Sequence, residues 1–185
     1  MAKAKVDRKT LDLVFVYLGL VATVVLVAVG SLAWVASDFV KKSVTSELSA
    51  QNIYFPELGS PALASLPDAD RVAMEQFAGE QLTTGEQAKV YANSFIGVHL
   101  SHIADGKTYS QVSAEAMKDP DNAALAGQKQ ALFQGETLRG LLLGDGYAFW
   151  TMGQIAYYAA VTAFGGALVM VLLVVLGLRH VSRAK

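Results

Sequence analysis

The stretch that decides the fold is residues 152–178, MGQIAYYAAVTAFGGALVMVLLVVLGL, which holds 27 residues and no charged side chain. A helix of this length extends about 40 Å, more than the roughly 30 Å hydrocarbon core of a bilayer. Inside lipid the backbone must satisfy its own hydrogen bonds, and a helix does so within one segment. The run therefore predicts a transmembrane helix.

A second run covers residues 13–36, LVFVYLGLVATVVLVAVGSLAWVA, with 24 uncharged residues. Two alternatives are a buried helix of a soluble core and a cleaved signal peptide. Soluble core helices seldom stay uncharged for so long, and a signal peptide has an apolar region of about 7–15 residues followed by small residues. Trp34 lies two residues before the end of the run, where a peptidase would need small side chains. A retained first span is favoured.

The composition of the whole chain excludes several classes of protein. The 185 residues include no cysteine, 53% are hydrophobic, and the formal net charge is −1. These values exclude a disulfide scaffold, a cysteine nucleophile, a thiolate metal site and a basic nucleic-acid binder. No phosphate-binding loop, dinucleotide fingerprint or serine-hydrolase motif occurs in the sequence. We therefore expect a protein that is not an enzyme, has no cofactor and binds no nucleic acid.

The distribution of charge predicts how the chain crosses the membrane. Residues 37–148 contain 8 basic and 14 acidic residues and sum to −6. The two tails have a summed charge of +5. They contain two acidic residues, Asp7 and Asp12, and seven basic residues: Lys3, Lys5, Arg8, Lys9, Arg179, Arg183 and Lys185. Basic residues near span ends stay in the cytoplasm, so both termini are expected inside and the middle outside. Lys41 and Lys42, just past the first span, are the one contrary signal.

These observations predict an all-α protein of the plasma membrane. Its expected parts are basic cytoplasmic tails at 1–12 and 179–185, transmembrane helices at 13–36 and 149–178, and a helical extracytoplasmic domain at 37–148. The middle segment is rich in Ala, Gln, Glu and Leu, which favour helix. We expect helices at 71–81, capped by Asp68 or Asp70, at 86–104, at 108–117, and from Asp119-Pro120 to about Leu143, and a joint at Gly144-Asp145-Gly146.

Small residues form a seam along each apolar run. On the second run they are spaced three and four apart, at Gly153, Ala156, Ala160, Ala163 and Ala167. A weaker seam on the first run comprises Gly19, Ala22, Ala33 and Ala36. Such seams let helices approach closely and gain dispersion contacts. Three interpretations stay open: pairing of the two spans within one chain, self-association between chains, and a chance result of an alanine-rich composition.

His99 and His102 form an H-x-x-H pattern, which places both rings on nearly the same face of a helix. A metal ion bridging them would need a third ligand such as Asp105, and the H-E-x-x-H motif of zinc enzymes is missing. The alternative is a pair of ordinary histidines that pack a helix face. A response to pH is a further option, because histidine titrates near neutrality.

Several short stretches resemble one family. They are Ser49-Ala50-Gln51-Asn52-Ile53, Tyr91-Ala92, His99, Gly106-Lys107-Thr108-Tyr109, and Gly135-Glu136-Thr137-Leu138-Arg139-Gly140. In this order the sequence resembles actinobacterial two-span membrane proteins that are often labelled automatically as aromatic ring-opening dioxygenases. The resemblance covers most of the chain from about residue 47 onward. It implies a lineage and an architecture, and no established activity.

The chemistry in that label is not expected here. Ring-opening dioxygenases hold iron with a set such as two histidines and a carboxylate. The chain has three histidines, and His180 is predicted on the opposite side of the membrane from His99 and His102. The leading hypothesis is a non-enzymatic protein in a homo-oligomer, or an accessory subunit of a larger envelope or respiratory complex. The alternative is a metal- or small-ligand-binding sensor or enzyme that uses the two outer histidines with Asp105 or Tyr109.

Overall fold

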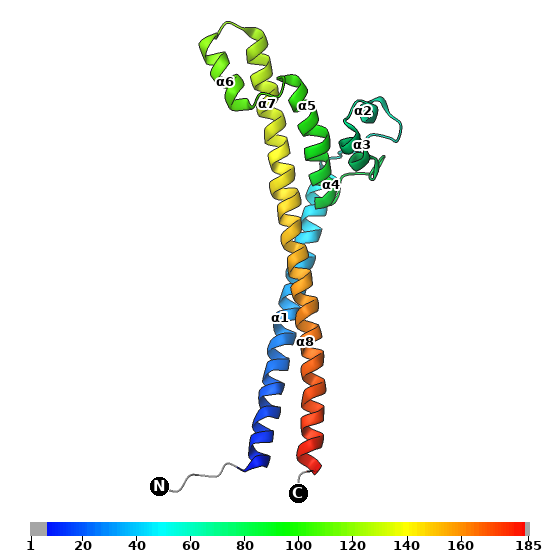
Figure 1. The fold of residues 1–185 in the computed structure, drawn as a ribbon, viewed down its shortest axis with the longest axis vertical. Coiled ribbons are helices and arrows are strands. Elements are labelled where there is room, and N and C mark those ends of the chain that lie inside the picture. The colour runs from blue at the N-terminus through cyan, green and yellow to red at the C-terminus, as the bar shows by residue number, and fades with distance from the viewer. Residues whose placement is uncertain (1–6, 184–185) are drawn as a thin grey trace. The chain divides into compact units, whose positions relative to one another are not determined.

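The computed structural model describes residues 7–183, which fold into two compact units (Figure 1). The apolar unit joins Met1–Phe39 to Gly153–Lys185, and the central unit is Val40–Met152. Within the described range there is no β-strand, and a single isolated bridge pairs Tyr54 with Gln81. The prediction of an all-helical chain is confirmed.

Two long helices supply the apolar unit. Helix α1 is Arg8–Ala50, and helix α8, Phe149–Arg183, continues without interruption a helical stretch that begins at Ala123. Each contains a segment that is long and apolar enough to cross a membrane. The prediction of two such helices is therefore confirmed.

Within the apolar unit the two helices pack antiparallel through small residues. A Cβ placed on Gly19 would lie 2.7 Å from Val174 Cγ2, and one on Gly30 would lie 3.0 Å from the Phe164 ring. The partner numbers fall along α8 as they rise along α1, which fixes the antiparallel direction. Buried residues on α8 are spaced seven, three, four and seven apart, at Gly153, Ala160, Ala163, Ala167 and Val174. This spacing is typical of a coiled-coil seam.

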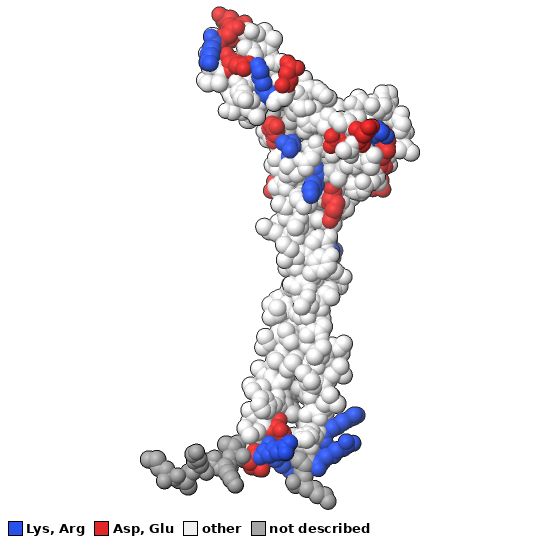
Figure 2. Space-filling model, viewed as in Figure 1, with Lys and Arg blue, Asp and Glu red and all other residues white. Residues whose placement is uncertain are grey.

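The rest of the surface of this unit is apolar. Leu32 is 72% exposed, and Phe15 and Val24 are exposed to a similar degree. Figure 2 shows charged side chains of this unit near the chain termini and an uncharged visible surface beyond them; Asp38, at the other end of the unit, is a further charged residue. A soluble protein rarely exposes so large a continuous apolar surface.

The central unit is built from short helices and the ends of the two long ones. Its elements are α2 (Pro61–Ala64), α3 (Asp68–Glu75), α4 (Gly85–Val90), the π-helix η1 (Tyr91–Ile96), α5 (Gly97–Ile103), α6 (Tyr109–Lys118), α7 (Ala123–Leu141) and the π-helix η2 (Leu142–Ala148). Segments α4, η1 and α5 follow one another directly, as do α7, η2 and α8.

The two continuous stretches of the central unit pack antiparallel at very short range. A Cβ on Gly85 would lie 2.3 Å from Trp150 Cβ, and one on Gly135 would lie 2.3 Å from Leu100 Cδ2. Only glycine fits at these two positions without movement of a neighbour. The packing closes a hydrophobic core around side chains such as Leu132, which is 2% exposed.

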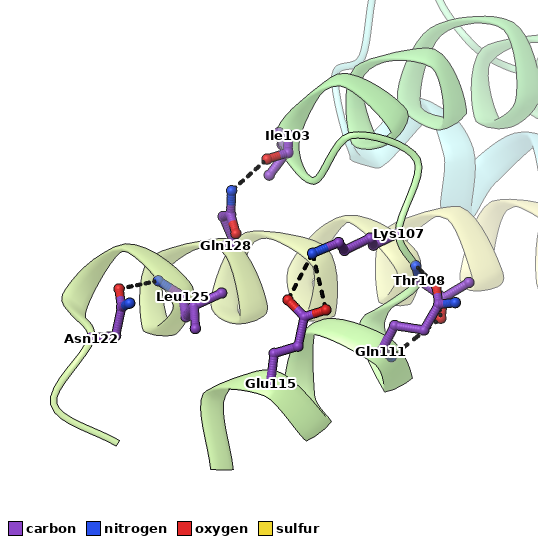
Figure 3. A network of polar contacts seen from close by, with 8 residues as sticks. All are labelled: Ile103, Lys107, Thr108, Gln111, Glu115, Asn122, Leu125 and Gln128. Carbon is purple, nitrogen blue, oxygen red and sulfur yellow. Dashed lines mark hydrogen bonds and ion pairs between the residues drawn. The ribbon is translucent and has the colours of Figure 1, made fainter. Parts of the chain in front are cut away.

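Capping residues define where the short helices start. Before α4, the Thr84 hydroxyl accepts a bond from Gln87 N–H at 3.3 Å, and the Gln87 side chain accepts one from Thr84 N–H at 3.0 Å. Thr108 and Gln111 repeat this arrangement before α6 (Figure 3). Such reciprocal bonds satisfy backbone donors that lack partners in the first helical turn.

Three local expectations were wrong. Residues 144–146 form no joint, because they lie inside η2, where a Cβ placed on Gly146 would lie 3.0 Å from Ala88 Cβ. Helix α7 starts after Asn122, whose side chain accepts from Leu125 N–H, instead of at Pro120. Helix α3 spans Asp68–Glu75 instead of 71–81, with Pro67 as its N-cap residue.

Candidate functional site

The outer histidines lie on α5 and are both exposed. His99 Nδ1 lies 2.7 Å from the Phe95 carbonyl oxygen, and the two rings are 4.5 Å apart. A bond to a carbonyl requires a proton on Nδ1, so the neutral ring leaves Nε2 as an acceptor. Over residues 7–183 no group of three or more His, Cys, Asp and Glu side chains is placed to hold a metal ion. Asp105 lies in the turn after α5 with φ of 52°.

Tyr109 contacts Phe133 of α7. Its ring centroid is 5.8 Å from that of Phe133, so it packs α6 against α7. The structure therefore gives this side chain a packing role between two helices.

His99 is the exposed end of a row of aromatic rings. Phe77, Phe55, Tyr91, Phe95 and His99 follow one another with centroid distances of 5.3, 5.4, 5.0 and 4.5 Å. Burial raises the pKa of the Tyr91 hydroxyl, because the charged form would lose its hydration. The row attaches the proline-rich segment after α1 to η1 and α5.

The small residues of the two apolar runs occupy different environments. Gly19, Gly153, Ala160, Ala163 and Ala167 are buried; Ala22, Ala33 and Ala156 are half-buried; Ala36 is exposed. Gly19 lies against Val174 of the same chain. At Gly19 the small-residue seam of α1 is therefore occupied by a side chain of α8 from the same chain.

The apolar unit also has a cavity of about 550 Å³ at its terminal end. Asp12 and His180 lie at this cavity with their nearest side-chain atoms 3.7 Å apart, too far for a hydrogen bond. The remaining lining is formed by apolar side chains and glycine: Phe15, Val16, Gly19, Met170, Leu173, Val174, Leu176 and Gly177.

A groove of about 530 Å³ in the central unit is a second candidate site. We name it the α1/η2 groove; it is lined by Ser43, Val44, Glu47, Leu48, Gln51, Leu141, Leu142, Asp145, Gly146 and Phe149. Val44, Leu48, Leu142 and Gly146 are buried and form an apolar floor. Leu141, 52% exposed, and the partly exposed Phe149 lie at the edge. The groove thus combines a buried apolar floor with exposed apolar side chains at its edge.

Two carboxylates stand at the rim without a partner. Glu47 and Asp145 are exposed, and neither forms a hydrogen bond or ion pair with any residue in the described part of the chain. Among the described residues some other carboxylates of the central unit are paired, since Lys107 Nζ lies 2.8 Å from Glu115 and Arg139 lies 3.3 Å from Glu136, whereas exposed ones such as Glu86 are not. The lining of the groove therefore carries two acidic side chains and no basic one.

Sequence reasoning missed this groove, because Glu47 and Asp145 come from opposite ends of the central unit. One signal was present. Asp145 is the only charged residue between Arg139 and Arg179. A lone carboxylate in so apolar a stretch marks a position worth testing. That Glu47 lines the same groove can be seen only in the tertiary fold.

Comparisons with known proteins give no assignment: no protein-family model, curated protein or solved structure matches the chain. The resemblance to actinobacterial two-span proteins therefore stays a prediction. Chemically, the α1/η2 groove offers an apolar surface beside two carboxylates.

Proposed function

We propose that the chain is a non-enzymatic integral membrane protein whose two spans carry an extracytoplasmic helical domain. This domain serves as a binding module in a homo-oligomer or in a larger envelope or respiratory complex. The proposal includes descent from the two-span family that the sequence resembles. The observation that carries it is the α1/η2 groove, an accessible apolar surface flanked by two carboxylates that have no partner among residues 7–183.

Membrane insertion is supported by the surface of the apolar unit. Side chains such as Leu32 and Phe15 are largely exposed there, and burying apolar area from water is worth about 25 cal/mol per Å². A bilayer covers such a surface without a protein partner. Both ends of the pair are then on the same side, because α1 and α8 are antiparallel.

The orientation is supported by charge. The tails sum to +5 and residues 37–148 to −6, so the positive-inside rule favours cytoplasmic termini. The central unit then lies outside the cell, and the α1/η2 groove is open to extracytoplasmic partners.

Binding to another subunit is tested by purification from native membranes in mild detergent. The native mass is compared with the 19.7 kDa of one chain, and co-purifying chains are identified and quantified. We expect either a multiple of this mass or a second protein in a constant ratio. A lone monomer with no co-purifying chain would contradict the proposal.

A second candidate function is binding of a metal or small ligand at His99 and His102. Its support is the His99 geometry, in which Nδ1 is engaged with Phe95 and Nε2 is left as an accessible acceptor. Metal analysis of the purified protein, and of His99→Ala and His102→Ala, tests it, with His180→Ala as the matched control. Stoichiometric metal that only the two outer substitutions remove would favour this function.

A further inference from the structure

We propose that the α1/η2 groove binds a basic amphipathic helix of a partner protein, with Lys or Arg of that helix against Glu47 and Asp145. The inference rests on the proposed binding function and names the chemistry of the partner. Its apolar side chains would cover the floor of the groove and the exposed edge at Leu141 and Phe149.

Each wall of the groove carries polar or apolar side chains spaced four apart. Ser43 and Glu47 lie one turn apart in α1, and Gln51 follows in the turn after this helix. Leu141, Asp145 and Phe149 are spaced four apart along the continuous helix of the other wall. Side chains four apart lie on the same face of a helix, so each wall presents one row of side chains to an incoming helix. Each row carries its carboxylate at the middle position, so both charges meet the same part of the incoming helix.

Charge selects the kind of helix. The segment 37–148 sums to −6, and the two groove carboxylates lack partners among the described residues. Covering them with a neutral helix would remove hydration without compensation, which is costly. A Lys or Arg at the matching position replaces that hydration with a charge-assisted hydrogen bond.

The same argument disfavours a second copy of this chain in a symmetric contact. A twofold interface places the same surface patch of each protomer against the other. Two grooves facing each other would bring four carboxylates together with no basic side chain in the lining. Like charges placed opposite one another weaken such a contact.

The probe is a fluorescein-labelled helical peptide of Leu and Lys, titrated against the full chain in phosphatidylcholine nanodiscs. Empty nanodiscs give the background, and a Leu/Glu peptide of the same pattern is the charge control. We expect Glu47→Gln with Asp145→Asn to weaken the specific binding at least about ten-fold. The matched control is Glu86→Gln with Asp121→Asn, two exposed carboxylates outside the groove, and should change it less than about two-fold.

The apolar contribution has its own pair of variants. Leu141→Gln lies in the groove and should weaken binding several-fold, whereas Phe133→Gln, equally exposed but outside it, should not. The inference is overturned if the Leu/Lys peptide does not bind above background, if both carboxylate pairs have the same effect, or if the Leu/Glu peptide binds as well.

The native purification separates failure of this inference from failure of the proposed function. A partner that still co-purifies with the Glu47→Gln/Asp145→Asn variant binds elsewhere, which overturns the inference and leaves the binding function standing. Loss of the partner in this variant, with retention in Glu86→Gln/Asp121→Asn, supports both. A wild-type chain that purifies as a lone monomer contradicts the proposed function itself.

Discussion

The apolar unit and the central unit pack their helices in the same way but expose different kinds of side chain. In both, helices approach through glycine, as at Gly19 against Val174 and at Gly85 against Trp150. The apolar unit exposes side chains such as Leu32, whereas the central unit exposes paired charges such as Lys107 and Glu115. Close approach therefore does not by itself distinguish a membrane pair from a water-soluble bundle. The residues on the outer surface of the helices make that distinction.

The driving forces for packing differ accordingly. The central unit buries a broad cluster of large side chains, and in water this burial is driven by the hydrophobic effect. If lipid surrounds α1 and α8, their contact gains only van der Waals packing and hydrogen bonds. Removing a side chain should therefore cost more free energy of unfolding in the central unit than in the apolar unit.

The largest effect is expected for Leu132→Ala in the core of the central unit. Leu132 is almost fully buried, so the variant should lose about 3 kcal/mol of unfolding free energy through lost burial and a cavity. Denaturant titration of the purified protein measures it. Leu138→Ala, on an exposed part of the same helix, is the control and should change stability by less than about 0.5 kcal/mol. Equal losses would show that the core lies elsewhere.

Gly85→Ala should destabilise the central unit by about 2 kcal/mol, because its Cβ would meet Trp150 Cβ at 2.3 Å. Gly140→Ala in α7 has open space around its Cβ and should be neutral or stabilise by up to about 1 kcal/mol. Thermal unfolding followed by tryptophan fluorescence compares the two. A neutral Gly85→Ala would contradict the described contact of α4 with Trp150.

Gly19→Ala tests the seam of the apolar unit and should cost about 1.5 kcal/mol, because the new methyl group meets Val174 Cγ2. Adding Val174→Ala removes that atom and should restore part of the loss, which a double-mutant cycle in SDS titration detects. Gly165→Ala, with open space around it, is the control. Strict additivity of the two substitutions would argue against the pairing of α1 with α8.

Thr84→Ala removes a helix cap of the central unit and should cost about 1 kcal/mol, because Gln87 N–H loses its acceptor. Thr84→Ser keeps the hydroxyl and should retain most of the stability. Hydrogen exchange of the first turn of α4 provides the readout. Unchanged exchange in Thr84→Ala would show that the cap does not hold this turn.

The sequence predicts some parts of this fold well for a clear reason. Uncharged runs of 24 and 27 residues leave few alternatives to long apolar helices, and α1 and α8 contain them. The expected joint at Gly144-Asp145-Gly146 failed because glycine is a local signal. At Gly146 the close contact with Ala88, which no local pattern shows, outweighs its low helix propensity.

The candidate site was less predictable than the fold. The α1/η2 groove joins Glu47 to Asp145 through tertiary packing, and these two residues come from opposite ends of the central unit. The histidine pair was found from spacing alone, yet the structure shows His99 at the end of an aromatic row. Spacing identifies residues that share a face, whereas a site also needs neighbours from other elements.

The central claim is that α1 and α8 cross a membrane, with both termini in the cytoplasm and the central unit outside. Because the chain has no cysteine, single substitutions Ser46→Cys and Ser182→Cys, both at exposed positions, report on the two sides. A membrane-impermeant maleimide added to intact cells should label Ser46→Cys at once, and Ser182→Cys only after the membrane is opened. Labelling of Ser182→Cys in intact cells would contradict the account.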